Sequence, residues 1–146
     1  MVNTLPSVTC PSNSSVCIDA TPYALTGGMP SGGTYSGTGV SMGTFNPAGA
    51  GVGTHTITYT YTDGNSCTNS CSFTITVNPL PVVSTGTYGP VCVDAADITL
   101  NGSPSGGTWS GAGVTGNTFD PSAGTQTLTY TYTDVNGCTN SAQTTI

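Results

Sequence analysis

The chain has 146 residues, its six acidic residues are all Asp, and it contains no Lys and no Arg. Nucleic-acid binding and adhesion to an anionic membrane surface both depend on Lys and Arg, so both function classes are excluded. The apolar residues alternate with polar ones between Gly and Pro, which is typical of a folded all-β chain.

Short strands are predicted near residues 7–9, 23–26, 34–36 and 43–45, and no stretch has a helical apolar period. The clearest strand follows at Thr54–Thr62, where the apolar side chains share one face and five threonines share the other. This period of two is that of a half-buried antiparallel strand. The sequence Asp63-Gly-Asn-Ser then predicts a hairpin turn, with Cys67 opening the returning strand.

The second half of the chain repeats the first. The segments that recur are Cys17-Ile-Asp-Ala as Cys92-Val-Asp-Ala, Gly32-Gly-Thr-Tyr-Ser-Gly37 as Gly106-Gly-Thr-Trp-Ser-Gly111, Thr44-Phe-Asn-Pro47 as Thr118-Phe-Asp-Pro121, Thr58-Tyr-Thr-Tyr-Thr-Asp63 as Thr129-Tyr-Thr-Tyr-Thr-Asp134, and Cys67-Thr-Asn-Ser70 as Cys138-Thr-Asn-Ser141. A repeat of this length indicates an array of small domains.

We therefore predict two tandem Ig-like antiparallel β-sandwich domains, residues 1–78 and 79–146, each with about seven strands. Pro79 and Pro81 form a short, stiff linker between them. Residues 2–6 echo residues 77–81, so we expect the chain to be a fragment excised at a repeat boundary, with further repeats on both sides. No signal peptide and no transmembrane run is recognised.

The six cysteines are expected to form disulfides, because domains of about 70 residues have marginal cores and such bonds imply an oxidising, extracellular location. Comparing the two copies suggests the pairing. Cys17 and Cys67 recur as Cys92 and Cys138, whereas Cys10 and Cys71 are replaced together by Thr85 and Ala142. The predicted bonds are Cys17–Cys67, Cys92–Cys138 and Cys10–Cys71; the alternatives are buried free thiols or a zinc site.

The aspartates raise the question of a cation site. A Cys17–Cys67 bond would bring Asp19 close to Asp63 and Asn65, and Asp94, Asp134 and Asn136 repeat the pattern in the second copy. No basic side chain is present to neutralise such a cluster, and calcium is the cation that prefers carboxylate and amide oxygens. Asp and Asn are also the usual residues of turns. We favour the turn interpretation, with calcium as the alternative and no other cofactor required.

Candidates for catalysis and ligand binding are few. His55 is the single histidine and its counterpart is Gln126, so a partly buried structural role is favoured over a catalytic one. No catalytic residue is assigned, and the chain is not expected to be an enzyme. Tyr35 and Trp109 occupy the same position; a core aromatic is favoured over a sugar-stacking platform. The ligand-binding residues are left unassigned.

The whole chain resembles the Ig-like repeats of giant cell-surface proteins of Bacteroidota, including the SprB-type gliding-motility adhesins. The resemblance rests on Pro79-Leu-Pro-Val-Val83, Cys92-Val-Asp-Ala95, Gly106-Gly-Thr-Trp-Ser-Gly111, Thr118-Phe-Asp-Pro121 and Thr129-Tyr-Thr-Tyr-Thr-Asp134 through Cys138, and on their counterparts in the first copy. It implies export by the type IX secretion system and display on the bacterial cell surface. The Cys10 and Cys71 pair departs from the pattern.

Two functions follow as hypotheses. In the first, the repeats are structural units of a large adhesin or filament, whose partners are neighbouring repeats or further copies of the same chain. In the second, each repeat is a lectin-like module that binds surface polysaccharide, and repetition supplies avidity.

Overall fold

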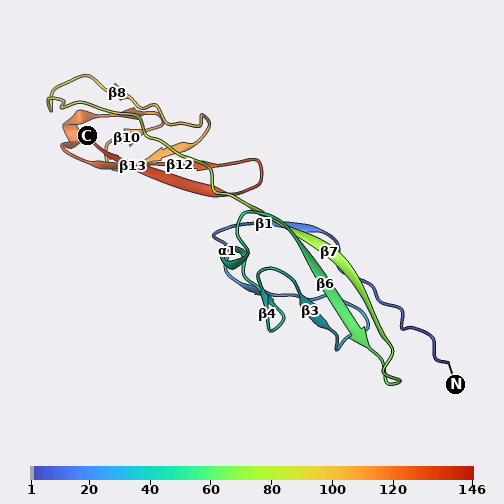
Figure 1. Cartoon of the computed structure of the whole chain (residues 1–146). Helices are drawn as coiled ribbons and strands as arrows, with labels where there is room; N and C mark the ends of the chain where they lie inside the picture. The colour runs from blue at the N-terminus through green and yellow to red at the C-terminus, as the bar shows by residue number, and fades with distance from the viewer. Residues whose placement is uncertain (1) are drawn as a thin grey trace. The chain divides into compact units, whose positions relative to one another are not determined.

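The computed structural model describes residues 2–146 and divides the chain into two compact units, Met1–Pro79 and Leu80–Ile146. Each unit is a β-sandwich with its own core, as the sequence predicts (Figure 1). We refer to them as unit 1 and unit 2 and describe each by itself.

Unit 1 has seven strands and one helical turn. They are β1 (Ser14–Cys17), β2 (Tyr23–Ala24), β3 (Thr34–Ser36), β4 (Val40–Ser41), β5 (Thr44–Phe45), α1 (Pro47–Ala50), β6 (Gly53–Thr62) and β7 (Thr68–Asn78). One sheet has the order β1-β7-β6-β3 and the other β2-β5-β4. The long hairpin of β6 and β7 contains the clearest strand of the sequence prediction, and the two strands pair antiparallel as predicted.

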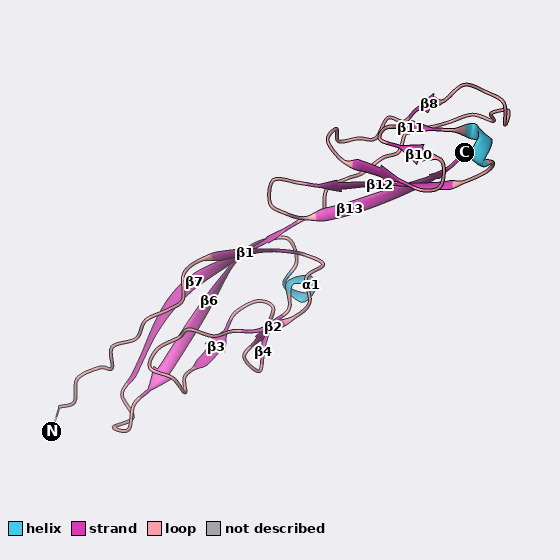
Figure 2. Ribbon diagram, turned by 180° about the vertical axis from the view of Figure 1, so that it is seen from behind, coloured by secondary structure: helices cyan, strands magenta, loops and turns pink. Residues whose placement is uncertain are grey.

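Unit 2 repeats this plan with six strands. They are β8 (Ile98–Thr99), β9 (Thr108–Ser110), β10 (Val114–Thr115), β11 (Thr118–Phe119), the 3₁₀ turn η1 (Pro121–Ala123), β12 (Thr127–Thr133) and β13 (Thr139–Thr145). The two sheets have the orders β13-β12-β9 and β10-β11-β8 (Figure 2). No described strand of unit 2 takes the place that β1 holds beside β7 in unit 1.

The inward faces of the hairpins form the two cores. The buried residues of unit 1 are Phe45, Ile57, Phe73, Ile75 and Val77, and those of unit 2 are Leu100, Trp109, Phe119, Leu128 and Tyr130. Those on β6, β7 and β12 are the apolar positions of the period-two pattern, while the threonines of β6 and β12 face outward or lie at partly covered positions. Burial of alternate residues therefore fixes the register of each hairpin.

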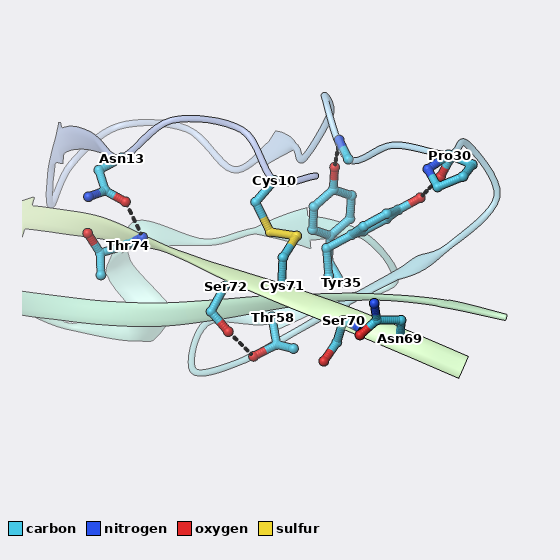
Figure 3. The surroundings of a disulfide bond; sticks show 12 residues. Cys10, Asn13, Pro30, Tyr35, Thr58, Asn69, Ser70, Cys71, Ser72 and Thr74 are labelled. Atoms are coloured by element: carbon cyan, nitrogen blue, oxygen red, sulfur yellow. Dashed lines mark hydrogen bonds between the residues drawn. A yellow bond between two sulfur atoms is a disulfide. The ribbon is translucent and has the colours of Figure 1, made fainter. Parts of the chain in front are cut away.

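The first segment of unit 1, from Pro6 to the end of β1 at Cys17, runs alongside β7 for most of the length of that strand. Three contacts attach the segment before β1 begins, and Figure 3 shows the second and the third. They are the Asn69 Nδ2 hydrogen bond to the Pro6 carbonyl oxygen at 2.9 Å, the Cys10–Cys71 disulfide with a Cα–Cα distance of 5.8 Å, and the Thr74 N–H bond to Asn13 Oδ1 at 2.9 Å. Strand β1 then pairs in parallel with residues 75–78 of β7.

The Cys10–Cys71 bond is confirmed, but the two other predicted bonds are wrong. Cys67 and Cys92 carry free thiols, so neither Cys17–Cys67 nor Cys92–Cys138 forms. The register of β7 explains the error, because Cys17 pairs with Asn78 at one end of this 11-residue strand and Cys67 precedes the other end. The ends are about 33 Å apart at about 3.3 Å per residue, and a disulfide requires Cα atoms within about 7 Å.

Two short helical turns were not predicted. In α1, Asn46 Oδ1 accepts a hydrogen bond from the Gly49 N–H at 3.1 Å and Pro47 occupies the first turn; in η1, Asp120 and Pro121 take the same roles. A single turn is too short to show an apolar period, so only the cap residue followed by Pro signals it. None of the helices among residues 2–146 has the length and apolar character needed to cross a bilayer.

Candidate functional site

Each hairpin turn holds an Asp and an Asn of the calcium site that the sequence offers as an alternative. Asp63 Oδ1 accepts hydrogen bonds from the N–H groups of Asn65 and Cys67, at 2.8 and 2.9 Å. Asp134 makes the same two bonds to Asn136 and Cys138, both at 2.9 Å. The carboxylate charge is thus met by backbone donors, which is the turn interpretation of the sequence.

The structure does not assemble the proposed calcium ligands. Asp19 follows β1 beside the end of β7, whereas Asp63 precedes the start of that strand. In unit 2, Asp94 adjoins residues that share a pocket with Ile146, at the opposite end of β13 from Asp134. Among the described residues, no three His, Cys, Asp or Glu side chains gather in one place. The cluster depended on the Cys17–Cys67 bond and is absent with it.

His55 holds a turn in place. Its Nε2 lies 2.8 Å from the Gly51 carbonyl oxygen, just after α1, and its ring lies near that of Phe45. Gln126, its counterpart, donates from Nε2 to the Ala123 carbonyl oxygen at 2.8 Å, at the end of η1. Two different side chains therefore perform one structural role, which supports the structural interpretation of the histidine.

The aromatic position shared by Tyr35 and Trp109 belongs to the cores. Trp109 is 8% exposed and packs against Tyr130 with ring centroids 5.0 Å apart, and Tyr35 lies 4.7 Å from Tyr59 in the same arrangement. The Tyr35 hydroxyl accepts a hydrogen bond from the Gly28 N–H at 2.7 Å. Trp109 is thus buried and Tyr35 partly buried, as expected of core aromatics.

In both units a buried tyrosine, Tyr59 or Tyr130, bonds through its hydroxyl to a loop that lies far away in the chain, a contact that sequence reasoning missed. The Tyr59 hydroxyl donates to the Pro30 carbonyl oxygen at 2.6 Å and accepts from the Gly33 N–H at 2.8 Å. Tyr130 makes the same pair of bonds, to Pro104 at 2.6 Å and from Gly107 at 2.8 Å. The repeated Tyr-Thr-Tyr and Gly-Gly sequences were visible, but nothing in their spacing shows that they meet.

A hydrogen bond from an asparagine side chain attaches the start of each unit to its long hairpin. Sequence reasoning missed this contact as well. Asn69 Nδ2 donates to the Pro6 carbonyl oxygen, and Asn140 Nδ2 donates to that of Pro81, both at 2.9 Å. Each Asn Oδ1 also accepts the N–H of the following serine at 2.9 Å. The sequence contains a signal for this contact: each repeat has Leu-Pro at its start and Cys-Thr-Asn-Ser near its end, and these are the segments that the hydrogen bond joins.

An open groove lies on corresponding surfaces of the two units. In unit 1 it has a volume of about 370 Å³ and is lined by Gly33, Thr34, Tyr35, Met42 and Gly43. In unit 2 it has a volume of about 420 Å³ and is lined by Gly107, Thr108, Trp109, Ser110, Gly111, Val114, Gly116 and Asn117. The fully exposed Met42 side chain is replaced by Gly116, so the groove recurs in position but differs in its rim.

The outer faces of the hairpins carry rows of hydroxyl groups. Thr54 pairs with Thr76 at 3.1 Å, Thr58 with Ser72 at 3.1 Å, and Thr62 with Thr68 at 2.9 Å between side-chain oxygens. In unit 2 Thr133 and Thr139 pair at 2.7 Å. These cross-strand bonds leave a hydroxyl-rich surface without Lys or Arg.

The comparisons with known proteins identify one family. The model of the HYR domain matches residues 3–77, which are just over half of the chain and nearly all of unit 1. No curated protein matches the chain at a significant level.

Proposed function

The chain belongs to the HYR-domain family, and on that premise we propose that it is a structural repeat unit of a large bacterial cell-surface adhesin or filament. The HYR domain is a non-catalytic Ig-like module, and a disulfide-bonded HYR domain indicates an extracellular protein. The proposal adds the role within an array: each unit extends the chain and keeps it folded.

The observation that carries the proposal is what the two units have in common. Both have the buried tyrosine that bonds to a distant loop, the Asp turn and the Asn hydrogen bond to the first residues of the unit, with hydrogen-bond lengths that agree within 0.1 Å. Exposed side chains differ, as Met42 against Gly116 and Gly64 against Val135 illustrate. The internal hydrogen bonds are the same in both units while the exposed residues differ. This is what a structural spacer requires, because its function depends on the fold of each unit and not on particular surface residues.

Export by the type IX secretion system and a part in gliding motility belong to the same proposal. Their support is the sequence resemblance to SprB-type repeats. The location on the bacterial surface has the same basis, with the confirmed Cys10–Cys71 bond as an independent sign of an oxidising compartment.

A lectin-like function is the second candidate, and the groove that recurs in both units favours it. The two functions differ in how binding depends on valency. A polysaccharide array or an agarose pull-down would compare the chain with a fusion of two chains in tandem. A steep gain on doubling supports the lectin. Absent binding, together with a scattering profile whose length doubles in the fusion, supports the spacer and excludes avidity.

A further inference from the structure

The loop between β8 and β9 in unit 2 borders an open cavity that has no assigned role. We call it the loop cavity; its volume is about 220 Å³, and the lining residues on which its chemistry depends are Asn101, Gly102, Ser105, Trp109, Asn117 and Tyr130. At about 30 Å³ for each molecule of liquid water, the cavity has room for about seven waters. This space is suited to one small ring with its substituents.

Several polar groups of the loop cavity have no partner within residues 2–146. The side chains of Asn101, Ser105 and Asn117 are exposed and make no hydrogen bond in this range, and the Gly102 N–H and the Trp109 indole N–H make none either. The indole nitrogen reaches solvent, because every fully buried side-chain nitrogen or oxygen of the described residues is hydrogen-bonded. Amide and hydroxyl side chains both donate and accept, so the cavity offers both kinds of group to a ligand.

Unit 1 shows which kind of atom suits the Gly102 N–H. The counterpart of Gly102 is Gly28, since each lies two residues before a cis-proline, and the Gly28 N–H donates to the Tyr35 hydroxyl at 2.7 Å. Trp109 stands in the place of Tyr35, and an indole has no acceptor, so the Gly102 N–H lacks this partner. A hydroxyl oxygen supplied by a ligand would make in unit 2 the bond that unit 1 makes with its own side chain.

Two further replacements place amide side chains at the loop cavity. Asn101 and Asn117 stand where unit 1 has Thr26 and Gly43. The correspondence is fixed by the backbone, because the leucine before Asn101 donates its N–H to the Asn117 carbonyl oxygen and the leucine before Thr26 donates to that of Gly43, both at 2.8 Å. The loop cavity therefore differs from its counterpart at three positions that share one backbone arrangement.

The loop cavity has an aromatic part and adjoins the groove of unit 2. Trp109 and Tyr130 both line it, with ring centroids 5.0 Å apart. Gly107, Trp109 and Asn117 line the loop cavity and the groove alike. A ligand longer than one ring can therefore continue from the cavity along the groove.

We propose that the loop cavity binds one sugar residue of a neutral polysaccharide, with a sugar hydroxyl at the Gly102 N–H in the place that the Tyr35 hydroxyl holds in unit 1. Sugar hydroxyls donate and accept, which matches the unpaired groups of the cavity, and the ring C–H groups suit its aromatic part. Acidic sugars are disfavoured, because the chain has no Lys or Arg and a net charge of −6.

This proposal deepens the lectin-like candidate function and rests on it. It assigns a single sugar site to the chain, in unit 2, because unit 1 has Thr26, Tyr35 and Gly43 at the three positions that differ. It also gives the ligand a chemical class, which is an uncharged, hydroxyl-rich glycan.

An NMR titration of the 146-residue chain tests the site. Trp109 is the single tryptophan, so its indole N–H gives one resonance. The neutral probes are glucose, galactose, mannose, N-acetylglucosamine and the neutral oligosaccharides of agarose, each added to about 10 mM, which is ten times a Kd of about 1 mM. At least one of them should shift the indole resonance saturably, together with the amide resonances of Gly102 and Gly107. Glucuronate and galacturonate should leave all three unchanged.

Three replacements exchange residues of the loop cavity for those of unit 1. Asn101→Thr and Asn117→Gly should each weaken binding about tenfold, the effect of one lost hydrogen bond. Trp109→Tyr brings a hydroxyl to the Gly102 N–H and should abolish binding, which is then followed at the Gly102 amide resonance. Unit 1 folds with the residues so introduced, which are Thr26, Gly43 and Tyr35.

The matched control is Asn136→Thr. Asn136 is exposed in the turn between β12 and β13, its side chain makes no hydrogen bond within residues 2–146, and it lines neither the loop cavity nor the groove. Its replacement should leave binding unchanged. Equal binding by the parent and by a variant that carries both Asn101→Thr and Asn117→Gly overturns the proposal.

Two results of the titration also overturn the proposal: no neutral probe moves the Trp109 indole resonance, or glucuronate binds as well as glucose. The polysaccharide array described above then tests the lectin-like function by itself. Binding on the array that leaves the Trp109 resonance unmoved would mean that the chain is a lectin with its site elsewhere. Absent binding on the array as well would exclude the lectin-like function and leave the spacer.

Discussion

The hydroxyl group of Tyr130 lies 2.6 Å from the carbonyl oxygen of Pro104, which is 26 residues earlier in the chain. The same hydroxyl accepts the Gly107 N–H, so one side-chain group holds the loop between β8 and β9 at two points. Tyr59 does the same with Pro30 and Gly33.

Replacing Tyr130 by Phe removes the hydroxyl and leaves the ring in the core. We expect the free energy of unfolding of unit 2 to fall by about 1 kcal/mol, because two backbone groups lose their partner. Urea unfolding followed by the fluorescence of Trp109, the only tryptophan, measures this. Tyr132→Phe is the control in the same unit, since its ring also packs against the core of unit 2 and its hydroxyl makes no hydrogen bond within residues 2–146. Equal effects of the two changes would show that the Tyr130 hydroxyl contributes nothing.

Gly102 lies against the ring of Tyr130. A Cβ at this position would stand 2.4 Å from two ring atoms, so either the ring or the loop must move. We expect Gly102→Ala to destabilise unit 2 by about 1–3 kcal/mol, the usual cost of overpacking. Gly64→Ala is the control, because no atom lies within 4 Å of a Cβ placed there. Unfolding monitored at Trp109 for the first variant, and by circular dichroism for both, tests the expectation.

The Cys10–Cys71 bond can be exchanged for the residues that unit 2 carries, as Cys10→Thr with Cys71→Ala. The sequence separation of 61 residues predicts a loss of about 4 kcal/mol from unit 1 in the chain-entropy model. Amide hydrogen exchange of β7 should accelerate accordingly, while exchange of β13 in the same molecule should not change. Unaltered protection of β7 would mean that the hydrogen bonds of Asn13 and Asn69 suffice to hold the first segment.

Acid should weaken unit 2 through Asp120. Hydrogen bonds from the Ser122 side chain and the Ser122 N–H lower the pKa of Asp120 from its usual 3.8. A group whose pKa is lower in the folded state stabilises above its unfolded pKa, and this contribution disappears as the pH falls through the folded value. Unfolding at Trp109 should therefore show a decline below about pH 4 that is reduced in Asp120→Asn. Asn46 already provides this uncharged cap in unit 1.

Calcium should leave thermal stability unchanged, because Asp19 and Asp63 stand at opposite ends of β7 and the turn carboxylates already accept backbone hydrogen bonds. Melting in calcium and in a chelator gives the comparison, with magnesium as the control cation. If the melting temperature rises with calcium and not with magnesium, the chain binds calcium through a set of ligands other than the one predicted here.

The long hairpins were predictable because alternation with a period of two is a local property of the sequence. Strand β1 was not, since its partner in β7 lies 61 residues away and parallel pairing leaves no turn to signal it. The same register explains the wrong disulfides. Recurrence of Cys17 and Cys67 shows that both positions matter in each unit, and it does not show that they meet within one unit.

The parallel course of the first segment and β7 has a mechanical consequence. When the two ends of unit 1 are pulled apart, the hydrogen bonds between β1 and β7 are loaded together, in shear, and do not open one after another. If these hydrogen bonds break, the Cys10–Cys71 disulfide still prevents the chain between the two cysteines from extending. At about 3.5 Å per residue, the 61-residue separation corresponds to roughly 200 Å of length that tension cannot release.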